Sequence, residues 1–156
     1  MVCYNLVPFV SERKYLLITV ILFLLFLCNT ETRAQVGEIF SRSEREERFG
    51  KITERAEMST ASLENILKTA DDYLMFGINE GKIVVADRNR SAVYPGNFML
   101  SSDKVMTIYS TSRIAELIAR GGAALLSAEQ RERAFTLRCG EYILEVGLPC
   151  PPYCIE

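Results

Sequence analysis

The feature that most constrains this chain is an uncharged, apolar stretch near its N-terminus. Residues 15–28 read YLLITVILFLLFLC and directly follow Arg13 and Lys14. A membrane-spanning helix needs about 20 apolar residues, whereas the apolar core of a signal peptide needs about 7 to 15 residues behind a positive end. The stretch has the length of a signal-peptide core, so we predict that it directs the protein across a membrane.

The residues after the apolar stretch predict where the signal is removed. Thr32 and Ala34 are small and occupy the two positions that a signal peptidase reads, which places cleavage before Gln35. Residues 1–34 are then the signal peptide. The exported protein is expected to be periplasmic or extracellular.

Two other interpretations of the N-terminus stay open. An uncleaved anchor, with Arg13 and Lys14 on the cytoplasmic side, gives the same export topology, and only residues 15–28 would then contact the membrane. In a lipoprotein Cys28 would be acylated, although Leu27 stands where a small residue is expected.

The composition excludes several function classes. Hydrophobic residues make up 49% of the chain and the formal net charge is -2. This balance argues against disorder and against binding to nucleic acid or anionic lipid by charge. The chain has no His, so it cannot build a Ser-His-Asp nucleophile, a His-ligated metal site or a histidine pH switch. It also lacks a glycine-rich phosphate loop, and we predict neither a cofactor nor a metal site.

Residues 35–72 are predicted to form an amphipathic helical segment. They are rich in Glu, Arg, Ala and Leu and contain no Pro, which favours helix. Apolar and small residues also recur at steps of three and four, as on one helix face: Phe49, Ile52, Ala56, Ser59, Leu63, Ile66, Ala70 and Tyr73. Gly50 and the polar run 59–62 weaken this pattern, so two helices broken near residue 60 are the alternative.

Residues 73–156 are predicted to form an α+β core with a cysteine-containing C-terminal tail. Residues 73–78 and 82–87 flank Asn79-Glu80-Gly81 and predict a hairpin with a three-residue turn. Short strands are expected at 92–94 and 104–109. The fold class that follows is α+β, with an antiparallel sheet of about four to six strands and helices packed on one face, preceded by the N-terminal signal helix. We find no internal repeat in the sequence.

The second half of this core is predicted to contain two helices and a hairpin. Residues 113–120 place Ile114, Leu117 and Ile118 on one face and end at two glycines. Ser127 and Gln130 resemble a capping box and predict a short helix that ends near residue 133. Residues 135–139 and 142–146 then predict a hairpin.

Three cysteines downstream of the signal are candidates for a disulfide. Cys139, Cys150 and Cys154 are expected to pair in an oxidising compartment, and three thiols can form one bond in three ways. Pairing of Cys139 with either of the others would tie the tail to the last hairpin, whereas Cys150 with Cys154 would close a tight loop. A catalytic redox motif or a thiolate metal site is less well supported, since the C-terminal spacing is not C-x-x-C.

Without His, carboxylates are the remaining candidates for general acid–base chemistry. These are Asp71, Asp72, Asp87 and Asp103, all near predicted turns, where Asp is favoured for structural reasons. Arg88 and Arg90 could bind an anion, but a solvated turn explains them more simply.

The sequence therefore favours an exported, noncatalytic protein that binds a protein partner or a component of the cell envelope. The alternative is a small carboxylate-based enzyme that acts on envelope glycans, for which two of the four aspartates must share a cleft. A membrane-tethered accessory subunit is a third option. The oligomeric state is left open.

The export hypothesis predicts the mature N-terminus. Because cleavage is expected before Gln35, intact-mass spectrometry of the exported protein should give the mass of residues 35–156. Retention of residues 1–34 on the exported protein would contradict cleavage and favour the anchor.

Overall fold

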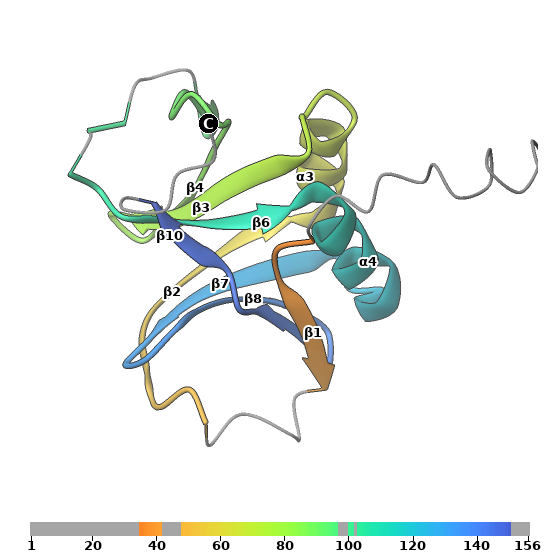
Figure 1. Ribbon diagram of the computed structural model, residues 1–156. Coiled ribbons are helices and arrows are strands. Elements are labelled where there is room, and N and C mark those ends of the chain that lie inside the picture. Colours follow the sequence, from red (N-terminus) through yellow and green to blue (C-terminus); the bar gives the residue numbers. More distant parts are fainter. Residues whose placement is uncertain (1–34, 42–47, 97–99, 102, 151–156) are drawn as a thin grey trace, which may run out of the picture. The chain divides into compact units, whose positions relative to one another are not determined.

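A computed structural model describes residues 35–41, 48–96, 100–101 and 103–150, and consists mainly of β-strands (Figure 1). The predicted signal peptide, Cys28 and Cys154 lie outside the described residues. The first half contains β1 (Glu38–Ser41), β2 (Ile52–Ser59), α3 (Thr60–Leu67), β3 (Tyr73–Asn79), β4 (Lys82–Ala86) and β5 (Ala92–Tyr94). The second half contains β6 (Met106–Ser110), α4 (Thr111–Gly121), β7 (Leu125–Arg131), β8 (Phe135–Cys139), β9 (Tyr142–Glu145) and β10 (Leu148–Cys150).

The strands form two antiparallel sheets. Sheet A has the order β1-β9-β8-β7-β2, and sheet B has the order β10-β6-β3-β4-β5. The predicted fold class is therefore wrong: the described residues form ten strands in two sheets, not one sheet of four to six strands with helices on one face. Both sheets bury one face in a shared core, which removes the need for a large helical layer.

The chain contains an internal structural repeat that the sequence analysis missed. The units β2-α3-β3-β4-β5 and β6-α4-β7-β8-β9 have the same order of elements. In each unit the first strand leaves the sheet formed by the other three and pairs with the other unit, because β2 pairs with β7 and β6 pairs with β3. The two units therefore exchange their first strands.

The two units have the same strand pairing at the point where the first strand continues into the helix. Ser59 pairs with Leu125, the first residue of β7, and Ser110 pairs with Tyr73, the first residue of β3. The next residue is threonine in both units, and no loop separates strand from helix. The short sequences STASLENIL at 59–67 and STSRIAELI at 110–118 carry this similarity.

Matching hydrogen bonds hold the two strand-to-helix junctions. The Thr60 N–H donates to the Ala124 carbonyl over 3.0 Å, and the Thr111 N–H donates to the Asp72 carbonyl over 2.8 Å. Both threonine hydroxyls lie 3.1 Å from the same carbonyl oxygens. The start of α3 is therefore bonded to the residue just before β7, the strand that follows α4. The start of α4 is bonded in the same way to the residue just before β3, the strand that follows α3.

The helix predicted at 113–120 is confirmed as α4. Ile114, Leu117 and Ile118 are its buried residues, and Gly122 ends it in the left-handed conformation with φ of 59°. Ser110 precedes the helix, but its side chain makes no capping bond and instead accepts a hydrogen bond from the Val36 N–H over 2.6 Å.

The predicted helical segment 35–72 is wrong over most of its length. It contains β1, β2 and only the short helix α3. Gly50 has φ of 76°, which a helix does not allow, and burial along β2 alternates, with Ala56 and Met58 inside and Glu57 outside. The break expected near residue 60 is the junction of β2 and α3. The spacing of three and four residues predicted a helix wrongly, because the residues that follow it lie partly in a strand and partly in a helix.

The short helix predicted after Ser127 is also wrong, because these residues lie in β7. Ser127 and Glu129 face one side of sheet A while Leu126 and Ala128 enter the core. Pairing with β2 and β8 satisfies the backbone hydrogen-bonding groups of β7. This tertiary context overrides the local capping signal.

Both predicted hairpins are confirmed. β3 and β4 pair with Asn79 opposite Lys82, so the turn has two residues rather than three. Glu80 and Gly81 both have positive φ, as a type I′ turn requires. β8 and β9 turn at Gly140, which also has positive φ. The predicted strands at 92–94 and 104–109 correspond to β5 and β6.

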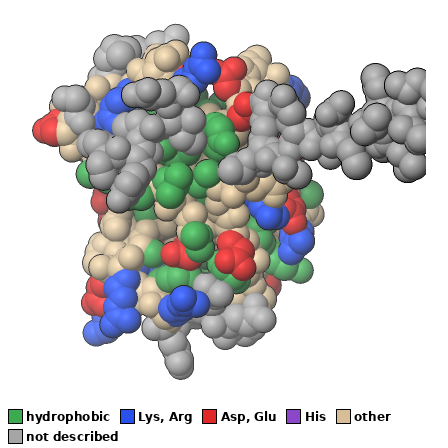
Figure 2. Space-filling view, in the orientation of Figure 1, with side chains coloured by type: hydrophobic (Ala, Val, Ile, Leu, Met, Phe, Trp, Pro, Cys, Tyr) green, Lys and Arg blue, Asp and Glu red, His purple; other side chains and the backbone are tan. Residues whose placement is uncertain are grey.

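The main core lies between the two sheets and the inner faces of both helices. Its fully buried members include Leu63, Phe76, Tyr109, Leu117 and Leu126. A second, smaller cluster covers the other face of sheet B around Met75 and Met106. Figure 2 shows hydrophobic side chains around the middle of the face where β6 and β10 run in Figure 1.

Tyr109 predicts how stability depends on pH. Burial raises the pKa of its phenol, and the negative charge of Glu145 raises it further. The unfolded chain ionises this phenol near pH 10, about its ordinary pKa. Because the folded state resists ionisation, the free energy of unfolding should fall above about pH 10, by at most about 1.4 kcal/mol per pH unit from this residue.

The Tyr109→Phe variant tests this dependence by urea unfolding at pH 7, 9 and 11. At pH 7 it should lose about 1 kcal/mol, since the hydroxyl donates to the Phe135 carbonyl over 2.7 Å. At pH 11 the gap between wild type and variant should narrow or reverse. An equal gap at all three values would contradict the role of the buried phenol.

Candidate functional site

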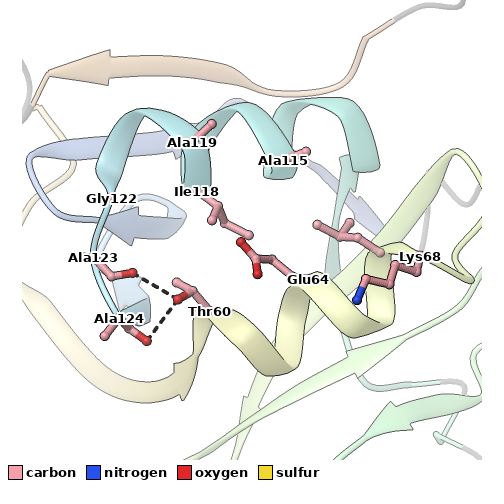
Figure 3. A pocket seen from close by; sticks show the side chains of 10 residues that line it. Thr60, Glu64, Lys68, Ala115, Ile118, Ala119, Gly122, Ala123 and Ala124 are labelled. Carbon is pink, nitrogen blue, oxygen red and sulfur yellow. Dashed lines mark hydrogen bonds between the residues drawn. The ribbon is translucent and has the colours of Figure 1, made fainter.

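A groove lies between α3 and α4 (Figure 3). Its volume is about 750 Å³, which lies within the range of about 300 to 1,000 Å³ for small-molecule sites. The lining residues come from both helices and from the segment that leads into β7: Thr60, Glu64, Leu67, Lys68, Ala115, Ile118, Ala119, Gly122, Ala123 and Ala124.

The groove exists because the two repeats differ in side-chain size at matching positions. Glu64 on α3 and Lys68, directly after α3, correspond to Ala115 and Ala119 on α4, counting from the threonine that begins each helix. The α3 wall is therefore long and charged, and the α4 wall is short and apolar. Long side chains at both alanines would fill the space between the helices.

The polar groups of the groove have different roles. The Thr60 hydroxyl is shared between the carbonyls of Ala123 and Ala124, so it is already occupied. The Lys68 ammonium donates to the Asn65 side chain over 2.9 Å. The Glu64 carboxylate points between the helices towards Ile118 in Figure 3, and no hydrogen bond or ion pair joins it to another described residue.

This arrangement suits binding better than catalysis. The groove offers an apolar wall on α4 and, opposite it, one carboxylate that can accept hydrogen bonds or face a cation. Its lining contains no cysteine, tyrosine or second carboxylate. The one amine in the lining, that of Lys68, donates to Asn65, and no ion pair joins it to Glu64 among the described residues. Sequence reasoning missed the site because the two walls are about 50 residues apart in the chain and only the fold brings them together.

Two of the four predicted aspartates share a second, smaller pocket. Asp71 and Asp87 line a cavity of about 380 Å³ next to the end of α3, together with Leu74 and Val93. The Asp87 carboxylate accepts hydrogen bonds from the N–H groups of Asn89 and Ser91, both over 2.9 Å. Asp71 lies 3.6 Å from the Arg88 guanidinium. Both carboxylates thus have local structural partners.

The other two aspartates lie apart from this pocket. Asp72 is exposed, and its backbone carbonyl anchors the start of α4. Asp103 is exposed, and the hydrogen bond from the Ser101 hydroxyl lowers the pKa of its carboxyl group. A carboxyl that ionises more readily is a poorer general acid near neutral pH. Neither residue lines the pocket that Asp71 and Asp87 share.

Arg88 and Arg90 do not form a joint anion site. Arg88 faces Asp71, whereas the Arg90 guanidinium donates to the backbone carbonyls of Ser101, Lys104 and Cys150. Arg90 instead fastens the loop before β6 to β10.

The structure narrows the choice of disulfide. Cys139 is a free, fully buried thiol, so neither pairing that includes Cys139 forms in this structure. Pairing of Cys150 with Cys154 stays a prediction, because Cys154 lies outside the described residues. Among the described residues no group of three or more Cys, Asp or Glu side chains is placed to hold a metal ion.

The most concentrated charge cluster lies on the outer face of sheet A. Glu129 is fully buried and one of its oxygens lies 2.7 Å from Arg55 and 3.2 Å from Arg138. Its other oxygen lies 2.5 Å from the Arg131 guanidinium, which is itself only 3% exposed. Both oxygens of the carboxylate are thus paired with arginines, and we interpret the cluster as structural.

Removal of this carboxylate should destabilise the fold. Glu129→Gln leaves the buried guanidinium of Arg131 without its counter-charge, and breaking a buried pair in this way costs about 3 to 5 kcal/mol. Urea unfolding at pH 7 measures the loss. The matched change at an exposed turn position, Glu141→Gln, should alter stability by less than about 0.5 kcal/mol. Similar stability of the two variants would show that the cluster is not structural.

Comparison with known proteins gives no relative from which a function could be transferred. No protein-family model, curated protein or solved structure matches the chain. Within the described residues, neither helix has the length and hydropathy of a membrane span.

Proposed function

We propose that the protein is an exported, noncatalytic binding protein whose binding site is the groove between α3 and α4. The observation that supports this proposal is an open, mainly apolar groove with a single carboxylate, Glu64, that has no partner among the described residues. Ligand sites typically combine such apolar walls with a few polar groups that orient the ligand.

The chemistry of the groove selects the kind of ligand. Ala115, Ile118 and Ala119 provide an apolar wall that favours an aliphatic or aromatic group. The carboxylate of Glu64 opposite this wall favours a basic group next to the apolar one. A segment of a protein partner that carries Lys or Arg beside a large apolar residue meets both requirements. Export to the periplasm or outside the cell, proposed from residues 15–28, would place such partners in the cell envelope.

A library of phage-displayed random peptides of about 12 residues provides a probe for this site. Selection on the full-length protein should enrich peptides with a basic residue next to an apolar one. Ala119→Phe, which fills the groove, should weaken the selected peptides by at least about tenfold, as expected for loss of an apolar anchor. Fluorescence anisotropy with labelled peptides measures the change.

Two controls separate the groove from the rest of the surface. Ala61→Phe makes the same change on an exposed face of α3 outside the groove and should leave peptide binding unchanged. Glu64→Gln should weaken peptides by a few-fold and only when they carry the basic residue. Peptides that bind Ala119→Phe as tightly as wild type would place their site elsewhere and reject the groove.

A carboxylate-based enzyme acting on envelope glycans is the second candidate, favoured by the pocket that Asp71 and Asp87 share. Two carboxylates on either side of one bond are the minimum for glycoside hydrolysis. Hydrolysis of purified cell-wall glycan by the wild-type protein, lost in both Asp71→Asn and Asp87→Asn, is the expected result for this candidate. Activity equal in wild type and both variants would reflect a contaminant, and absence of activity would leave the binding function.

A further inference from the structure

The free edge of β2 differs from its counterpart in the other repeat. The Thr60 N–H bonds to the Ala124 carbonyl, and the pattern of an antiparallel ladder alternates. Every second residue of β2 therefore directs its N–H and C=O groups away from β7. These residues are Arg55, Glu57 and Ser59.

The matching groups on β6 are paired. Ser110, which corresponds to Ser59, donates its N–H to the Val36 carbonyl over 3.0 Å. Ile108 and Met106, which correspond to Glu57 and Arg55, pair with Leu148 and Cys150 of β10. Within the described residues β2 is the last strand of sheet A, and no hydrogen bond joins its outward groups to another segment.

The empty position beside β2 also faces sheet B. β4 packs against β2 across the core, and β5 is the next strand beyond β4 in sheet B. Sheet B therefore continues past the free edge of β2, and Tyr94 of β5 packs against the main core. A strand added beside β2 would take the position that β10 takes beside β6 in the other half. It would lie over β5.

We propose that the free edge of β2 binds an extended segment of a partner protein as an added antiparallel strand. Such strand addition supplies affinity through backbone hydrogen bonds and specificity through alternate side chains. A second copy of this chain does not fit, because pairing of two β2 strands would bring the β4 of one copy into the space of the β5 of the other. The site accepts a single strand.

The charges on β2 define the sequence that fits. Arg55 and Glu57 lie on the outer face, on either side of Ala56, whose side chain enters the core. On the β7 side Arg55 contacts Glu129, and Glu57 accepts a hydrogen bond from the Ser127 hydroxyl, so a partner strand would meet both side chains from the opposite side. An antiparallel partner meets Glu57 first, so the favoured order is basic, apolar, acidic. The apolar residue between them would point inward, on the same side as Ala56.

Two synthetic peptides of opposite charge order serve as probes. Acetylated Thr-Val-Lys-Val-Glu-Val-Thr amide has the favoured order, and Thr-Val-Glu-Val-Lys-Val-Thr amide has the reverse. Titration of the isotopically labelled full-length protein, followed by NMR, should shift the amide signals of Arg55 and Glu57. The first peptide should bind about two- to fivefold more tightly than the second, the range expected for cross-strand charge pairs.

Backbone methylation provides a matched control for strand addition. The Lys N–H of the first peptide would point at β2, whereas the N–H of its central Val would point away. Methylation of the Lys nitrogen should weaken binding by about tenfold or more, and methylation of the Val nitrogen should have little effect. Equal effects of the two methyl groups would overturn the proposal.

A charge reversal on the protein tests the register. Glu57→Lys should make the second peptide the tighter ligand, while Glu141→Lys, in the exposed β8–β9 turn, should preserve the original preference. Ala119→Phe should not alter binding of either peptide, which separates this edge from the groove. Shifts confined to the groove, or no shift at β2 with either peptide, would overturn the proposal.

Hydrogen exchange of the free protein is a second, ligand-independent test. The amides of Arg55 and Glu57 should exchange faster than those of Ile108 and Ser110, which are paired. Protection of Arg55 and Glu57 in the free protein would show that another segment of the chain or a second copy already covers the edge, and would overturn the proposal.

Discussion

The structure depends on the exchange of first strands between the two repeats. β2 completes the sheet of the second repeat and β6 completes the sheet of the first. The backbone bonds of Thr60 and Thr111 fix the point at which each strand turns into a helix. Because these pairings are reciprocal, neither repeat can bury its inner sheet face or satisfy its strands without the other, and the two sheets share one core.

Departures from this internal symmetry create both proposed binding surfaces. Ala115 and Ala119 on α4 stand where the first repeat has Glu64 and Lys68, and the space that these alanines leave is the groove. β10 covers β6, whereas the matching edge of β2 is open among the described residues. Symmetry-related positions experience the same packing constraints, so a difference between them reflects the side chains or segments that each repeat adds rather than the fold itself.

Local signals in the sequence predicted the elements that local interactions build. The β3–β4 and β8–β9 hairpins form between neighbouring segments with a glycine in each turn, and α4 has an apolar face and a glycine stop. The errors fell on β2 and β7, which pair with each other across about 70 residues of sequence. Arg and Glu have high helix propensity, so residues such as Arg55 and Glu129 favoured a helix in the sequence. In the structure these two side chains pair across neighbouring strands. Among the described candidate site residues, Asp71 and Asp87 share a pocket.

The sequence by itself determined the apolar stretch at residues 15–28, the absence of imidazole chemistry and the short-range turns, because these depend on composition and on neighbours in the chain. Only the tertiary structure decided that residues 52–59 form a strand, that Cys139 is a buried free thiol and that α3 and α4 enclose a groove. A strand needs a partner for its hydrogen bonds, and a groove needs two walls. In this protein, those partners and walls come from distant parts of the chain.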